Sequence, residues 1–125
     1  MARPAAQLYV RLPVTADEQV EEIARMWREQ VRRPAPLPRD PYGFDVMEID
    51  TYSAGCIDVF LKSPARFVRD KKRLQVLRTC FEDINQLWDG LAADQKEYLG
   101  HLQQIVSEIL MWHARKTHGK RAKAI

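Results

Sequence analysis

The sequence predicts an all-α fold: a compact bundle of about four helices, with a long helical hairpin in the C-terminal half. Apolar residues recur at intervals of three and four in several segments, which is the period of one helical face. Proline and glycine fall between those segments. At 125 residues and 46% hydrophobic content, the chain is large enough for one domain with its own core. We therefore expect a single helical domain over residues 1–114 and a basic tail over residues 115–125.

The first predicted helix begins at Thr15, because Thr15 and Glu18 have the spacing of a capping box. Its apolar stripe consists of Val20, Ile23, Ala24, Trp27 and Val31. The helix ends before the run RPAPLPRDPYG, whose prolines exclude helix and favour an extended path. Residues 34–43 are therefore expected to form a proline-rich connection.

The first 14 residues are expected to form an extended arm. In QLYVRLPV the apolar residues alternate, as they do in a strand, but Pro13 would confine such a strand to a sheet edge. Whether residues 8–14 form a strand stays open. The arm lacks the apolar run of a signal peptide, and no stretch of the chain is long and apolar enough to cross a membrane. We expect a cytoplasmic protein in which Cys56 and Cys80 are reduced, buried thiols.

The stretch DVMEIDTYSAGCIDVFLKSP, residues 45–64, fits two structures. As a β-hairpin it has β-branched residues in both arms, yet its turn lacks the Asn-Gly or Asp-Gly pair of tight hairpins. As a helix it places six residues on one side: Val46, Ile49, Ser53, Cys56, Ile57 and Phe60. Asp45 and Glu48 then have capping-box spacing, and Gly55 would allow a neighbouring helix to approach. The helix over residues 45–62 is the preferred interpretation.

Two further helices complete the predicted bundle. Residues 64–89 have a stripe of Phe67, Leu74, Leu77, Phe81, Ile84 and Trp88. Residues 92–113, or slightly beyond, have a stripe of Tyr98, Leu102, Ile105, Ile109 and Trp112. The short break at Gly90 makes these two helices antiparallel neighbours. The three tryptophans are expected to pack in or beside the core.

The net charge of +3 is distributed unevenly. The tail contains five basic residues and no acid, so the other 114 residues, with 15 basic and 17 acidic side chains, have a net charge of −2. Residues 40–61 contain five acids and no lysine or arginine, and residues 66–73 contain five bases beside Asp70. Because the last two helices are antiparallel, the basic cluster and the tail are expected at the same end of the hairpin.

We found no pattern of catalytic or metal-ligating residues in the sequence. On the preferred helix the acids of residues 45–62 do not converge, as paired catalytic carboxylates must. The glycines occur singly, no Cys-x-x-Cys occurs, and Glu97 with His101 supplies at most two metal ligands. We therefore expect no enzyme activity, no cofactor and no metal.

A small helical bundle without a catalytic set is typical of proteins that act by binding another protein, such as inhibitors, immunity-type proteins, adaptors and assembly subunits. The candidate interface acids are Glu48, Asp50 and Asp58. The alternative is a nucleic-acid-associated subunit, because basic clusters and tails bind phosphates. Its candidate contacts are Arg66, Arg69, Lys71, Lys72, Arg73, Arg115, Lys116, Lys120, Arg121 and Lys123. A homo-oligomer also stays open.

Overall fold

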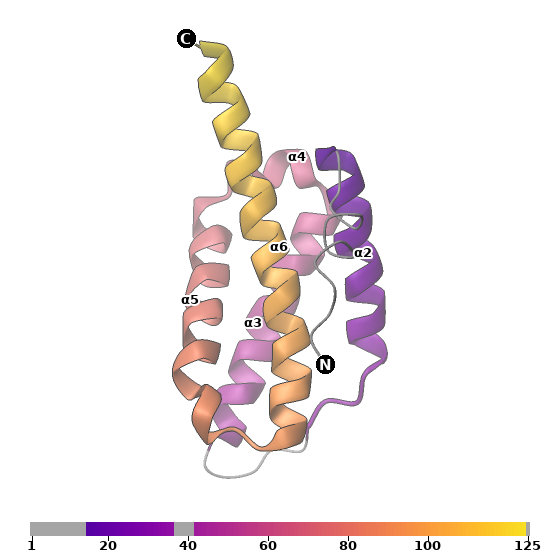
Figure 1. Ribbon diagram of the computed structural model, residues 1–125, viewed down its shortest axis with the longest axis vertical. Helices are drawn as coiled ribbons and strands as arrows, with labels where there is room; N and C mark the ends of the chain where they lie inside the picture. Colours follow the sequence, from indigo (N-terminus) through magenta and orange to yellow (C-terminus); the bar gives the residue numbers. More distant parts are fainter. Residues whose placement is uncertain (1–14, 37–41, 125) are drawn as a thin grey trace, which may run out of the picture.

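The computed structural model describes residues 15–36 and 42–124, and the side chains only as far as His118. In these ranges the chain forms helices and no strand (Figure 1). Their bounds are α2 (Ala16–Arg32), α3 (Gly43–Lys62), α4 (Pro64–Phe67), α5 (Lys71–Leu87), a 3₁₀ turn η1 (Trp88–Gly90) and α6 (Ala93–Ala124). The four long helices alternate in direction along one axis, which confirms the predicted all-α bundle. The arm over residues 1–14 and residues 37–41 of the proline-rich connection lie outside the described residues.

Helix α2 begins as predicted. The backbone N–H of Glu18 donates to Thr15 Oγ1 at 3.0 Å, and the Thr15 hydroxyl donates back to the Glu18 carboxylate at 3.1 Å. The helix packs mainly against α6. Two buried amides fix that pairing, since Gln30 Nε2 donates to the carbonyl of Tyr98 at 3.2 Å and Gln19 Nε2 to that of Glu108 at 3.4 Å.

The helical interpretation of residues 45–62 is confirmed, and all six residues of its predicted stripe are buried. The start of the helix differs from the expectation. Helix α3 begins at Gly43, and its cap residue Tyr42 makes no side-chain capping bond. Asp45 therefore lies inside the first turn, where a carboxylate still interacts favourably with the helix dipole.

The continuous helix predicted over residues 64–89 is wrong. Helix α4 ends at Phe67, a turn follows, and Asp70 caps a new helix, α5, by accepting from the backbone N–H of Arg73 at 3.1 Å. The turn allows Phe67 to be buried against Phe60, with ring centres 5.4 Å apart. Phe67 and Leu74 are seven residues apart, which also suits one unbroken helix, so the apolar period does not reveal the break.

Helix α6 is the centre of the bundle and contacts α2, α3 and α5. Its buried side chains include Leu99, Leu102, Ile105, Val106, Ile109 and Trp112. Trp112 packs edge-on against Phe60, with ring centres 5.0 Å apart, and so joins α6 to α3. The helix has 32 residues and continues through most of the predicted tail, projecting beyond the other helices (Figure 1). No helix among the described residues is long and apolar enough to cross a membrane.

Replacing Asp70 with alanine should destabilise the protein by about 0.5–2 kcal/mol, because α5 loses its cap. Asp70→Asn is the matched control, because it keeps the capping oxygen and loses only the ion pair with Arg73. Its free energy of unfolding should fall by less than about 1 kcal/mol. Urea unfolding would measure both. Equal losses for the two variants would contradict the capping role.

The same residue gives a pH dependence. The hydrogen bonds from the Arg73 side chain and backbone hold the pKa of Asp70 below its ordinary value. Because the pKa of Asp70 is lowered in the folded state, its carboxylate adds stability at pH values above its ordinary pKa. That stability is lost as the pH falls through the lowered pKa. The stability difference between the natural protein and Asp70→Asn should therefore close below about pH 4.

Candidate functional site

A groove runs between α3 and α5 and has a volume of about 490 Å³. Its walls are Asp45, Glu48, Ile49 and Tyr52 of α3, and Gln75, Val76, Thr79, Cys80, Asp83, Gln86 and Leu87 of α5. We call this the α3–α5 groove. It is hollow because α5 presents small side chains, Val76, Thr79 and Cys80, where a bundle would otherwise place large ones. Its lining is mainly apolar, and Tyr52 at its edge is 57% exposed.

Three carboxylates line the groove: Asp45, Glu48 and Asp83. Among the described residues no lysine, arginine or histidine lines it, and none of the three carboxylates makes an ion pair or hydrogen bond with a described residue. Within the described part of the chain, the groove is therefore a mainly apolar hollow whose three carboxylates have no basic partner.

The thiol in the groove is not a reactive group. Cys80 is only 3% exposed, and burial raises its pKa above the ordinary value. Burial also raises the pKa of Cys56, which faces the same core. Both cysteines are free and buried, as expected, and a thiol held in its neutral form is a poor nucleophile.

Of the three candidate interface acids, only Glu48 lies in the groove. The Tyr98 hydroxyl donates to Asp50 Oδ1 at 2.9 Å, so Asp50 joins α3 to α6. Trp27 Nε1 donates to Asp58 Oδ1 at 3.1 Å, so Asp58 joins α3 to α2. The four acids of residues 45–62 therefore do not all converge, as expected, although Asp45 and Glu48 line the same groove. Asp83 was missed because its place beside Glu48 depends on how α3 and α5 pair.

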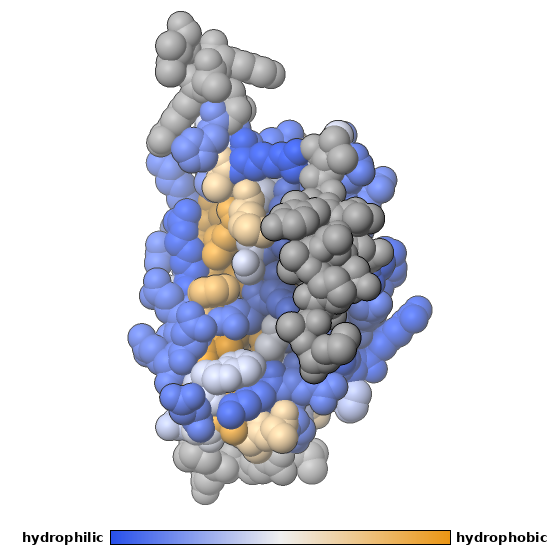
Figure 2. Space-filling view, in the orientation of Figure 1, coloured by the Kyte–Doolittle hydropathy of each residue, from blue (hydrophilic) through white to orange (hydrophobic). Residues whose placement is uncertain are grey.

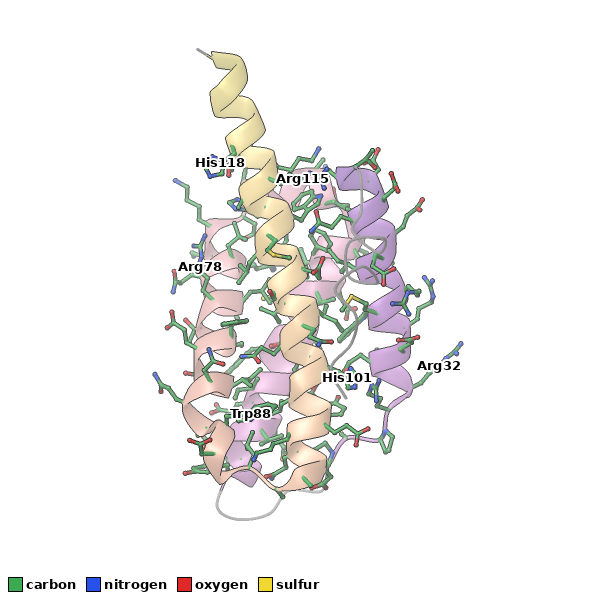
Figure 3. The ribbon with its side chains drawn as sticks, in the orientation of Figure 1. Arg32, Arg78, Trp88, His101, Arg115 and His118 are labelled. Carbon is green, nitrogen blue, oxygen red and sulfur yellow. The ribbon has the colours of Figure 1, made fainter. Side chains whose placement is uncertain are left out.

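The basic cluster and the C-terminal part of α6 lie at the same end of the bundle, as expected (Figures 1 and 3). The cluster consists of the exposed residues Arg66, Arg69, Lys71, Lys72 and Arg73. At this end Arg115 donates to Gln19 Oε1 at 3.5 Å, and the Lys116 ammonium lies 5.9 Å from the centre of the Trp112 ring. The acidic first turn of α2 borders the same end. The side chains of Lys120, Arg121 and Lys123 lie outside the described residues.

The seam between α5 and α6 is a second apolar surface. Figure 2 shows an apolar strip along the seam between α5 and α6, but this seam is bridged by Gln103, which donates to Asn85 Oδ1 at 2.8 Å and to the carbonyl of Phe81 at 3.1 Å.

The half-buried tryptophans, Trp27 and Trp88, pack against the core as expected. Among the described residues no group of three or more His, Cys, Asp or Glu side chains could hold a metal ion.

The Asp50–Tyr98 pair gives a second pH dependence. Burial raises the pKa of Asp50, and burial together with Asp50 raises the pKa of Tyr98 to about 12. The folded state thus binds the Asp50 proton more tightly than the unfolded state, so this carboxyl lowers stability as the pH rises past its ordinary value. Asp50→Asn should keep an acceptor for Tyr98 without the charge, and should be at least as stable as the natural protein at neutral pH.

Tyr98→Phe is the complementary variant. The substitution should lower the free energy of unfolding by about 1–3 kcal/mol at neutral pH, because the half-buried Asp50 carboxylate loses its hydrogen-bond donor. The loss should be smaller near pH 4, where the Asp50 carboxyl is partly protonated. Urea unfolding at the two pH values would measure both effects. A loss independent of pH would show that the hydrogen bond to the carboxylate is not what the tyrosine contributes.

No protein family model matches the chain, and no curated protein or solved structure matches it. A proposal for its function therefore rests on the geometry of the molecule, and above all on the α3–α5 groove and the basic end.

Proposed function

We propose that this protein acts without catalysis, by binding another protein at the α3–α5 groove. The observation that supports this most directly is the groove itself: an open, mainly apolar hollow of about 490 Å³ with an exposed tyrosine at its edge. Protein interfaces concentrate their binding energy where an apolar or aromatic anchor fills such a hollow.

The chemistry of the groove favours binding over catalysis. Its lining contains no histidine, and its thiol has a raised pKa and little exposure. Hydroxyl or thiol nucleophiles need an adjacent base or a lowered pKa to react. Thr79, which carries the aliphatic hydroxyl among the described lining residues, accepts a hydrogen bond from Gln75 Nε2 at 3.4 Å, and glutamine is not a base.

Nucleic-acid binding is the second candidate function, supported by the basic cluster and the end of α6 lying together. Three observations weigh against it. Asp70 pairs with Arg73 at 2.7 Å, and Arg115 and Lys116 contact Gln19 and Trp112 of the bundle. The tail contains no aromatic residue to stack on bases. We rank protein binding first for these reasons.

Filling the groove tests the proposal. Thr79→Trp places a large side chain at an exposed position of the groove wall and should weaken binding of the partner, recovered by affinity purification from the source, by at least about 10-fold. Arg78→Trp is the matched control, because Arg78 is the preceding residue of α5, is exposed and lies outside the groove (Figure 3). Both variants should unfold within about 0.5 kcal/mol of the natural protein. Unchanged affinity of Thr79→Trp for the partner would refute groove binding.

Deleting residues 115–125 separates the two candidate functions. Affinity for the protein partner should remain largely intact at moderate salt. Binding to a random-sequence duplex, measured by fluorescence anisotropy, should be weak and should disappear with the deletion. The five basic residues of the tail limit its share of the salt dependence to a slope of about 4–5 on duplex DNA. Loss of the partner on both nuclease treatment and tail deletion would favour nucleic-acid binding instead.

A further inference from the structure

The charge and shape of the groove indicate what kind of partner it fits. Resting on the proposed function, we infer that the α3–α5 groove binds a cationic amphipathic helix of the partner protein. The apolar face of that helix lies on Ile49, Tyr52, Val76 and Leu87, and its lysines or arginines lie against the groove carboxylates.

Charge gives the first argument. Elsewhere in the molecule, acids near a base form ion pairs: Glu22 and Glu29 with Arg25, and Asp70 with Arg73. Asp45, Glu48 and Asp83 form none with any described residue and share one hollow. Cations supplied by a partner would pair with these carboxylates, so charge complementarity selects a basic ligand.

The walls of the groove give the second argument. Both walls are helices, whose backbone groups are bonded within each helix, so a strand cannot be added at this site. One tyrosine is too few for the aromatic-lined groove that polyproline segments require. The lining of α5 extends from Gln75 to Leu87, about 18 Å along the helix axis, which is enough for three turns of a docked helix. A helix lying along the groove is the mode that fits these walls.

Gly55 gives the third argument. It follows Tyr52 by three residues, so both lie on one side of α3. A Cβ atom placed on Gly55 would meet nothing within 4 Å, so the expected close approach of a neighbouring helix is absent within the described chain. Glycine inside a helix costs about 0.5–1 kcal/mol relative to alanine, and no contact within the described chain requires it. A partner helix that passes Tyr52 would therefore meet no side chain at Gly55.

The carboxylates also give the docked helix a polarity. All three lie toward the start of α3 and the end of α5, whereas Lys71 and Lys72 lie at the opposite end of α5. The basic residues of the partner helix should therefore gather at one of its ends. The tail of a second copy does not meet these requirements, since residues 115–125 contain five bases but only alanines and one isoleucine as apolar residues.

The test is a selection from a displayed library of 18-residue helical peptides, randomised at both polar and apolar positions. The full-length natural protein is the bait, and Thr79→Trp is the counter-selection bait. We expect peptides that bind the natural protein, lose at least about 10-fold in affinity on Thr79→Trp, and carry lysine or arginine clustered at one end beside an apolar face.

Charge variants test the role of the carboxylates in the selected peptides. Each of Asp45→Asn, Glu48→Gln and Asp83→Asn should weaken binding by about 2- to 5-fold, and the triple variant by roughly 10- to 100-fold. The matched control is Glu82→Gln, an exposed acid of α5 outside the groove, which should leave affinity unchanged. Raising the salt concentration should weaken binding to the natural protein and not to the triple variant.

The other outcomes separate this inference from the proposed function. Groove-dependent peptides without basic residues, or with extended sequences rich in proline, would overturn the inferred partner and leave protein binding at the groove intact. Failure to select any peptide that is sensitive to Thr79→Trp would overturn both. A dimer of this chain that is disrupted by Thr79→Trp would replace the partner helix with a second copy.

Discussion

The fold depends on α6 contacting three helices at once. A helix on the surface of a bundle needs one apolar face, but α6 buries side chains toward α2, α3 and α5. This explains why the apolar residues of α6 extend well beyond a single stripe, from Leu99 to Trp112. Helix α2 packs chiefly against α6, whereas α3 and α5 pack against each other as well as against α6.

The groove is a consequence of this arrangement. Helices α3 and α5 both direct their large apolar side chains toward the core. Helix α3 contributes Ile57 and Phe60, and α5 contributes Leu77 and Ile84. Their outer seam is then lined by smaller and polar residues, which do not fill the space between two cylinders. The hollow therefore lies on the flank of the bundle that α6 does not cover.

Charge is separated along the long axis of the molecule. The basic cluster opens α5 and the groove carboxylates lie near its other end, so α5 has positive residues at its N-terminus, opposite to what the helix dipole favours. The cap formed by Asp70 offsets part of that cost. A charge arrangement that costs free energy in the isolated protein is reasonable where it orients a charged partner, because such fields steer association and select the ligand.

The sequence by itself determined the all-α class and the start of α2, because apolar periodicity and the Thr15 cap are local signals. For residues 45–62 it favoured a helix over a hairpin. It also determined the buried face of α3, since all six residues of the predicted stripe are buried, and Gly43 at the start of the helix is the one addition. Only the tertiary structure decided where the helix after Pro64 is interrupted, because burial of Phe67 against Phe60 is a contact between distant segments. It likewise decided which acids share a site: Asp50 bonds to Tyr98 and Asp58 to Trp27, whereas Glu48 of α3 and Asp83 of α5 line the same groove. Such pairing depends on the register between α3 and α5, which no local pattern in either helix specifies.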